Sequence, residues 1–315
     1  MNILFKKVFF FIFFFSFFLQ IYQIALSEKN IFVVLKVDDK IITNVDIQNE
    51  LNYLIALNND LKDIDRNSVI KIAKDSLVRE AIKIKELTNY FDLSEISEIS
   101  NDVIKDFYIK LNLNDEEEFI NYLKLYKLSL TEIKTKIGIE ILWNNFIAKR
   151  YQNQVNVDVV KIKEKIKNEK ISSVNEVEYN LSEIIFRSKT NQKIDALAIE
   201  IQESIKTEGF NNSANKYSLA DSSKFGGRIG WIKKTQLSKD LIEKLKNLKV
   251  NEISDVIKIT NGFMILKIND MRTIKKKLDN KKILEEMVNF EQQKQYNQYS
   301  IIHYNKLKNN TLISE

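Results

Sequence analysis

The sequence predicts an α+β fold, in which a mainly helical domain precedes a smaller module of strands and helices. Apolar residues recur at helical spacing through much of the first half of the chain. Three of the six glycines fall within the five residues from Gly226 to Gly230, where a tight turn or a close backbone approach is expected. The Asn261-Gly262 pair stands between two apolar runs, which is the strongest short signal for a hairpin.

Two capping boxes mark helix starts in the first half of the chain. A hairpin is expected from Ile31 to Thr43, because apolar residues alternate there around a pair of aspartates. Thr43 with Asp46 then begins a helix that runs to about residue 56, and Ser129 with Glu132 begins a long helix that ends near residue 151. The other expected elements are a polar loop and four helices, at 58–65, 69–90, 99–111, 115–125 and 157–170.

The second half of the sequence predicts seven elements in the order strand, helix, helix, strand, helix, strand, strand. The strand that follows the glycines alternates, which puts Ile229 and Trp231 on one face. A charged helix is expected from Lys275 to about Leu307, with a short strand at 311–313. The elements between are a strand at 177–186, helices at 192–206, 210–217 and 237–248, and strands on both sides of Asn261-Gly262.

Composition excludes several classes of site. The chain has no cysteine, so no disulfide or thiolate site is possible, and it has one histidine, His303, which we interpret as a packing or surface residue. It also has no proline, which reflects either codon bias or a chain free of slow X-Pro bonds. The net charge of +6 is spread along the helices, so no nucleic-acid partner is expected. No cofactor, metal or nucleotide is expected, since no phosphate-binding glycine loop occurs.

The N-terminus has the pattern of a signal peptide. Lys6-Lys7 precedes an apolar run at 8–19 that contains one serine, Ser16, and Ala25-Leu26-Ser27 offers small residues for cleavage after residue 27. We therefore expect residues 1–27 to be removed on export to the periplasm. If 21–26 is counted with the apolar run, the segment can instead serve as an uncleaved membrane anchor.

The glycine loop, the hairpin signal and the order of elements resemble the parvulin (PpiC or rotamase-type) module of peptidyl-prolyl isomerases. Beyond the module, the chain resembles the SurA family of periplasmic chaperones, whose opening hairpin is matched by 37–43 and whose C-terminal segment is matched by 301–313. The resemblance implies one parvulin-like antiparallel sheet with surrounding helices. It divides the chain into a signal peptide, a helical chaperone domain, a parvulin-like domain and a C-terminal helix that packs on the helical domain, at 1–27, 28–172, 177–272 and 273–315.

The resemblance also indicates a proline cleft whose polar floor is altered. Active parvulins carry two histidines there, and the matching positions here are Glu183 and Met264. Asp221 corresponds to the family's loop Cys or Asp, and Asn261 to a Ser found in some members. No confident catalytic residue remains, so we expect weak or absent isomerase activity. An ionised Glu183 in a half-apolar cleft is costly, so its pKa should rise or its side chain turn outward.

The apolar wall of the cleft is better matched. The resemblance assigns peptide binding to a set of apolar residues, namely Ile232, Leu237, Leu241, Phe263 and Met264. The alternative is that such residues are ordinary core residues.

The function that the resemblance implies is an ATP-independent periplasmic chaperone. It would bind unfolded outer-membrane or other exported proteins on apolar surfaces of the helical domain. The first alternative is an active peptidyl-prolyl cis-trans isomerase that assists the folding of exported proteins. The second alternative is a membrane-anchored folding helper at the translocon exit, which touches the membrane only through an uncleaved N-terminal segment.

Overall fold

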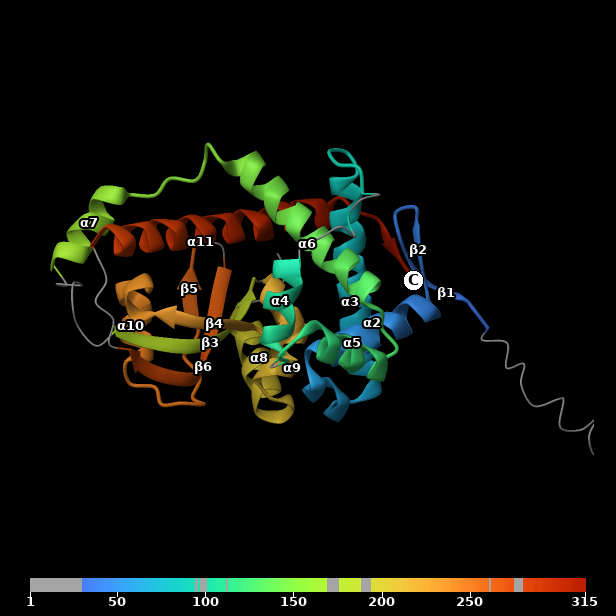
Figure 1. Cartoon of the computed structure of the whole chain (residues 1–315). Helices are drawn as coiled ribbons and strands as arrows, with labels where there is room; N and C mark the ends of the chain where they lie inside the picture. Colours follow the sequence, from blue (N-terminus) through green and yellow to red (C-terminus); the bar gives the residue numbers. More distant parts are fainter. Residues whose placement is uncertain are drawn as a thin grey trace, which may run out of the picture.

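A computed structural model describes most of the chain, at residues 30–93, 96, 101–111, 113–168, 176–187, 194–260, 262–274 and 280–315. The predicted signal peptide and Asn261 lie outside these residues. Within them the protein has an α+β fold that contains two separate antiparallel sheets (Figure 1). The fold class predicted from the sequence is confirmed.

The first half of the chain is helical apart from its opening hairpin. Both predicted capping boxes are present, because the Thr43 and Ser129 side chains accept from the backbone N–H groups of Asp46 and Glu132, whose carboxylates bond back. The elements are β1 (Val33–Val37), β2 (Lys40–Thr43), α2 (Asn44–Leu57), the 3-10 helix η1 (Asn59–Asp63), α3 (Arg66–Leu87), α4 (Asn101–Lys110), α5 (Glu116–Leu125), α6 (Leu130–Tyr151) and α7 (Val159–Asn168).

The second half forms the parvulin-like module that the sequence predicts. Its four strands lie in the order β4-β3-β6-β5, and every neighbouring pair is antiparallel. The elements are β3 (Glu176–Phe186), α8 (Ile194–Glu208), α9 (Phe210–Tyr217), η2 (Asp221–Phe225), β4 (Arg228–Lys233), η3 (Lys234–Gln236), α10 (Lys239–Leu245), β5 (Ile257–Ile259) and β6 (Gly262–Ile274).

The end of the chain returns to its beginning. The long helix α11 (Asn280–Asn309) passes over the module and reaches α6 and α3, as Figure 1 shows in red. The last strand, β7 (Ile313–Ser314), then pairs with β1, so that the first and last described strands share the sheet β2-β1-β7. The sequence predicts a terminal strand here but not its partner.

Four apolar clusters hold the described residues together. The largest fills the helical part and includes Trp143 of α6 and Tyr304 of α11. Two others lie on opposite faces of the four-stranded sheet, one against α10 and the other against α8 and α9. A small fourth cluster joins Ile166 of α7 to Ile283 and Met287 of α11, which places α7 on the C-terminal helix and apart from the main helical core.

One expected strand pattern is wrong. Ile229 and Trp231 do not share a face of β4, because Gly230 has a φ of +83° and the register with β3 slips there. Ile229 packs with the α10-side cluster, whereas Trp231 pairs with Asn180 and lies under the guanidinium of Arg272, 4.0 Å from the ring centre. The bulge therefore turns the indole to the other face of the sheet.

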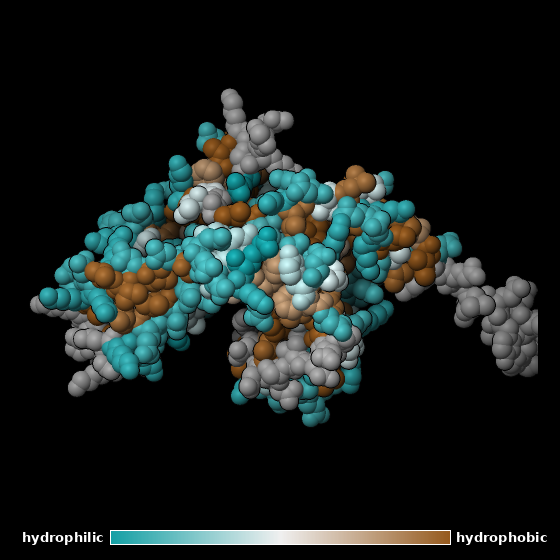
Figure 2. All heavy atoms as spheres, turned by 90° about the horizontal axis from the view of Figure 1, so that it is seen from above, coloured by the Kyte–Doolittle hydropathy of each residue, from teal (hydrophilic) through white to brown (hydrophobic). Residues whose placement is uncertain are grey.

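Large apolar side chains are exposed around the three-stranded sheet. Ile31, Phe32 and Leu312 expose 69%, 59% and 72% of their surface, and Val33 and Ile41 of the hairpin are also exposed. Figure 2 shows brown atoms gathered at this end of the molecule. Separately, none of the helices in the described part of the chain has both the length and the apolar character that a membrane crossing requires.

Candidate functional site

The glycine loop is shaped by close backbone contact with β3. Gly226 and Gly227 have φ values of +66° and +80°, which L side chains rarely adopt. A Cβ added at Gly227 would lie 2.4 Å from the carbonyl oxygen of Glu183. The Glu183 N–H donates to the Gly227 carbonyl at 2.8 Å, so the two backbones are in direct contact. The loop therefore positions the segment before it against the middle of β3.

Glu183 lies partly buried beside that loop. The hydroxyl of Ser222, in η2, donates to its Oε1 at 3.0 Å. Burial raises the pKa of Glu183 to about 7, and the charge of Asp221 adds to this rise while the Ser222 hydrogen bond opposes it. The side chain has not turned outward, and near neutral pH it is divided between a carboxylic acid and a carboxylate. Ser222 follows Asp221 directly, but a serine at this position is not marked as a site residue by any pattern in the sequence.

Asp221 is bound by a residue of the helical part. Lys83 of α3 places its Nζ 2.8 Å from Asp221 Oδ1 and 2.6 Å from Glu140 Oε2 of α6. The Lys83 side chain is 2% exposed, so this cation depends on the two carboxylates. Nothing in the sequence distinguishes Lys83 from the surface lysines of the same helix.

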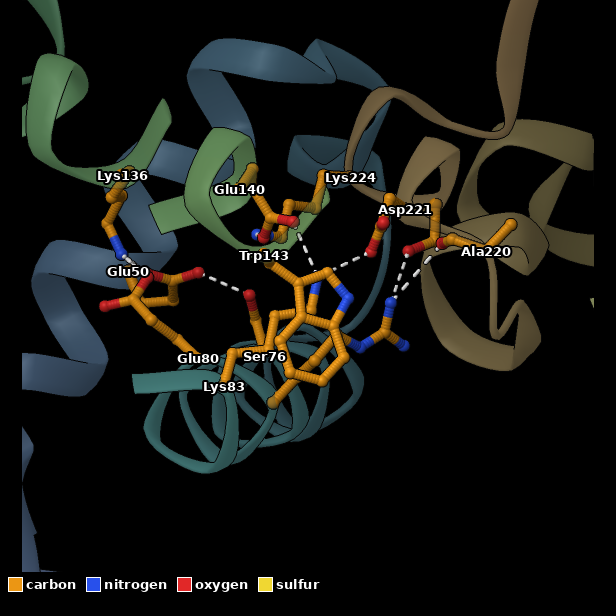
Figure 3. A network of polar contacts seen from close by, with 12 residues as sticks. Glu50, Ser76, Glu80, Lys83, Lys136, Glu140, Trp143, Ala220, Asp221 and Lys224 are labelled. Carbon is orange, nitrogen blue, oxygen red and sulfur yellow. Dashed lines mark hydrogen bonds and ion pairs between the residues drawn. The ribbon is translucent and has the colours of Figure 1, made fainter. Parts of the chain in front are cut away.

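A second lysine completes the charge network. Lys224 of η2 contacts Glu140 Oε1 at 2.8 Å, and Figure 3 shows this carboxylate between Lys83 and Lys224. Burial alone would raise the pKa of Glu140, but the two lysines hold it well below its usual range. The same pairing holds the pKa of Lys224 above its usual range, although burial acts to lower it. Both groups are therefore charged at neutral pH.

Polar side chains continue this interface along the segment that precedes η2. Arg79 of α3 donates to the carbonyl oxygens of Ser218 and Ala220 at 3.2 and 3.3 Å. Asn58, beside η1, is almost fully buried and donates to Asn215 of α9 at 2.7 Å. These contacts join residues that are far apart in the sequence, so no local pattern predicts them.

Four of the five predicted wall residues come together. Ile232, Leu237, Leu241 and Met264 belong to the α10-side cluster, in which Leu237 and Met264 are buried. The assignment of Phe263 to this wall is wrong, because its side chain packs in the cluster on the opposite face, beside Phe186. Adjacent residues of a strand point to opposite faces, so Met264 and Phe263 do not line one wall.

Glu183 and Met264 share that α10-side face. Glu183 pairs with Leu266 in the register of β3 and β6, and Met264 pairs with Ile185, so the two lie on neighbouring cross-strand positions. This arrangement offers an apolar wall, one hydroxyl and one carboxyl that donates a hydrogen bond only when protonated. It can bind an apolar segment and has no imidazole at the two matched positions. Asn261, the fourth candidate, lies outside the described residues.

His303 contacts residues of α6 and α3 in the helical core. It is almost fully buried in α11, where the Tyr151 hydroxyl lies 2.8 Å from its Nδ1 and Glu86 Oε1 lies 3.1 Å from its Nε2. Burial lowers the pKa of His303, and Glu86 offsets only part of this. The interpretation of His303 as a packing residue agrees with these contacts.

Comparisons with known proteins match both parts of the chain. Residues 174–270 match the Rotamase family, described as the PPIC-type PPIASE domain. The periplasmic chaperone PpiD of Buchnera aphidicola (Schizaphis graminum) is 29% identical over 273 residues, which cover 86% of this chain and 36% of that protein. The chaperone SurA of Chromobacterium violaceum is 26% identical over 154 residues, which cover 46% of this chain and 35% of that protein.

Solved structures also match over most of the chain. One of them comes from a study of PEB4 and Cj1289, two SurA-like chaperones of Campylobacter jejuni, and is 16% identical with a TM-score of 0.33, covering 90% of this chain and 98% of that one. This chain spans about a third of the length of the curated PpiD and SurA proteins that it matches. The chain therefore contains a PpiC-type parvulin domain and is homologous to the periplasmic chaperones PpiD and SurA.

Proposed function

We propose that this protein is an exported, ATP-independent chaperone that binds unfolded outer-membrane proteins in the periplasm. Its parvulin domain has weak or absent isomerase activity and serves to hold clients. The division at 28–172, 177–272 and 273–315 belongs to the same proposal. The observation that carries the chaperone role is the exposed apolar side chains beside the three-stranded sheet, with Ile31 and Leu312 about 70% exposed (69% and 72%). Apolar patches of this kind are typical of surfaces that bind other proteins.

The test replaces the exposed residues and leaves the core intact. The triple variant Ile31→Ser, Phe32→Ser, Leu312→Ser removes apolar surface from the sheet. A matched control, Leu125→Ser, Val160→Ser, Ile199→Ser, changes three side chains of 78%, 68% and 65% exposure on α5, α7 and α8. Aggregation of a urea-unfolded porin is followed by light scattering after dilution. The sheet variant should lose most of its protection while the control retains it, and equal protection by both would contradict the proposal.

Deleting the parvulin domain is a poorer test of the same idea. Lys83 and Glu140 are charged groups whose partners lie in η2, and Phe107 of α4 packs on Phe225 with ring centres 5.4 Å apart. A chain cut at residue 177 would leave the Lys83–Glu140 pair and Phe107 uncovered and without their η2 partners, which would destabilise the helical part itself. Surface substitutions avoid this complication.

Weak isomerase activity is supported by the polar groups of the cleft. Glu183 and Met264 occupy the two positions that carry histidines in active parvulins, and Asp221 is engaged by Lys83. Turnover should therefore be low in a proline-limited refolding assay and should increase in the double variant Glu183→His, Met264→His. The control is the double variant Glu183→His, Met264→Leu, which lacks the second histidine. Appreciable turnover by the unsubstituted protein would contradict this part of the proposal.

The alternative of an active isomerase has one observation in its favour. Ile232, Leu237, Leu241 and Met264 are assembled in one cluster, as a proline-binding wall requires. Isomerisation needs tighter binding of the twisted amide than of the planar one, and an apolar wall supplies part of this. The refolding assay above decides between the two functions.

Export and cleavage of residues 1–27 are also proposed. The support is the apolar run that follows Lys6 and Lys7, together with the periplasmic chaperones to which the chain is related. Mass spectrometry of the protein recovered from the cell envelope distinguishes cleavage from anchoring. A mass that includes residues 1–27 would favour the anchored helper instead.

A further inference from the structure

The 3-10 helix η2, which precedes the glycine loop, contacts the helical part through charged, polar and aromatic side chains. Asp221 binds Lys83 of α3, Lys224 binds Glu140 of α6, and Phe225 packs on α4. Arg79 adds a hydrogen bond of 3.2 Å to the Ser223 hydroxyl, besides its two bonds to backbone carbonyls. One face of η2 is therefore fixed to three helices of the helical part.

The other face of the same segment contacts β3 at the candidate cleft. The Ser222 hydroxyl donates to Glu183 at 3.0 Å. Just before η2, the N–H of Ile185 donates to the Ser218 hydroxyl at 3.1 Å, and the Leu219 N–H donates to the Ile185 carbonyl at 2.7 Å. Asp221 and Ser222 are neighbours in one short 3-10 helix, so a contact that places the first also places the second.

We propose that Lys83 of the helical domain is a positioning residue of the parvulin cleft, which holds Asp221 and thereby fixes the Ser222 hydroxyl against the Glu183 carboxyl. A buried cation requires its carboxylate partners, so the contact persists while the two domains are docked. The polar floor of the cleft is in this way completed by a residue outside the parvulin domain. The inference extends the proposed function to the cleft, and it does not depend on chaperone activity.

The charges near Glu183 give the proposal a measurable consequence. Asp221 acts directly on Glu183, Lys83 neutralises Asp221 from α3, and Glu140 and Lys224 complete the set from α6 and η2. Removing Lys83 leaves Asp221 as an uncompensated negative charge beside a second carboxyl. Removing the Asp221 charge has the opposite effect on Glu183.

The experiment follows the titration of the Glu183 carboxyl carbon by NMR in the full chain. Its resonance is assigned from its loss in Glu183→Gln. The titration midpoint should shift upward in Lys83→Met and stay at the parent value in Lys83→Arg. The upward shift in Lys83→Met should be smaller when Ser222→Ala is also present, because loss of the Ser222 hydrogen bond is part of that shift. The matched control is Lys85→Met, on the same helix, whose 66% exposed side chain pairs with Asp38 and does not face η2.

The dependence of the shift on Ser222 separates positioning of the hydroxyl from the direct effect of the Asp221 charge, which Ser222→Ala leaves in place. An unchanged midpoint in a folded Lys83→Met variant would overturn the proposal. If Lys83→Met does not fold, Asp221→Asn decides, since its aspartate side chain is 41% exposed and its replacement leaves no buried charge of its own. A shift in Asp221→Asn that is the same with and without Ser222→Ala also overturns it. Porin aggregation and proline turnover are separate readouts, so failure of the proposed function is recognised independently.

Discussion

The indole Nε1 of Trp143 donates a hydrogen bond of 2.7 Å to the hydroxyl of Ser300, 157 residues further along the chain. Trp143 is fully buried in the core of the helical part, and Ser300 lies on α11. The C-terminal helix is therefore part of that core. The core of the helical part is completed by a segment from the other end of the chain.

Replacing Ser300 with alanine should lower the free energy of unfolding by about 1–3 kcal/mol, because the buried indole N–H loses its acceptor. Denaturant unfolding followed by tryptophan fluorescence measures this change. Asn297→Ala, an exposed position on the same helix, is the matched control and should change stability by no more than about 0.5 kcal/mol. Equal effects of the two substitutions would show that α11 does not depend on this bond.

Burial of His303 predicts a loss of stability in mild acid. Its folded pKa lies below the ordinary value of 6.5, so the unfolded chain binds a proton more readily between those two values. Stability should therefore fall as the pH drops through 6.5 toward the folded pKa. The difference in unfolding free energy between the parent and His303→Gln, measured at about pH 8 and about pH 5, isolates this contribution. A difference that does not change with pH would contradict the prediction.

The contribution of Glu183 to stability should depend on pH in the opposite direction to that of His303. Its pKa is about 7 in the folded protein against an ordinary value of 4.5, so its contribution is complete below 4.5 and is lost as the pH rises through 7. The parent should lose up to roughly 3 kcal/mol relative to Glu183→Gln across that interval. Unfolding experiments at several pH values measure this, with the exposed Glu203→Gln as control. The prediction fails if the two variants follow the same profile.

Gly227 should tolerate a side chain much less well than Gly209. Both have positive φ values, +80° and +84°, so alanine is strained at either position, by on the order of 1–3 kcal/mol. Only at Gly227 does the added Cβ meet another backbone, the Glu183 carbonyl oxygen at 2.4 Å, whereas nothing lies within 4 Å at Gly209. Gly227→Ala should therefore lower the unfolding free energy clearly more than Gly209→Ala. Equal losses of stability in the two variants would mean that the backbone of β3 moves away from the added Cβ at little cost.

Local signals were sufficient for most of the secondary structure. The capping boxes at Thr43 and Ser129 act within one helical turn, and Gly227 acts on its own backbone and on the strand beside it. The order of strands and helices in the module was predicted for the same reason. The assignment of Ile229 and Trp231 to one face failed, because strict alternation ends where Gly230 opens a bulge.

The candidate site was predicted only in part. Glu183 and Met264 do share a face, and four of the five wall residues meet in one cluster. Phe263 was misplaced although strand alternation argues against its pairing with Met264. Ser222, Lys83 and Arg79 were missed, because a lysine or arginine on a charged helix has the same sequence pattern whether it faces solvent or another domain.

The sequence by itself determined where helices begin, where the backbone turns and which apolar stripes face a core, because these depend on residues within a few positions of one another. Only the tertiary structure decided that Lys83 lies between Glu140 and Asp221, 138 residues from the latter, and that Ser300 completes the core around Trp143. Burial decides the behaviour of these polar groups, and burial depends on which distant surfaces meet.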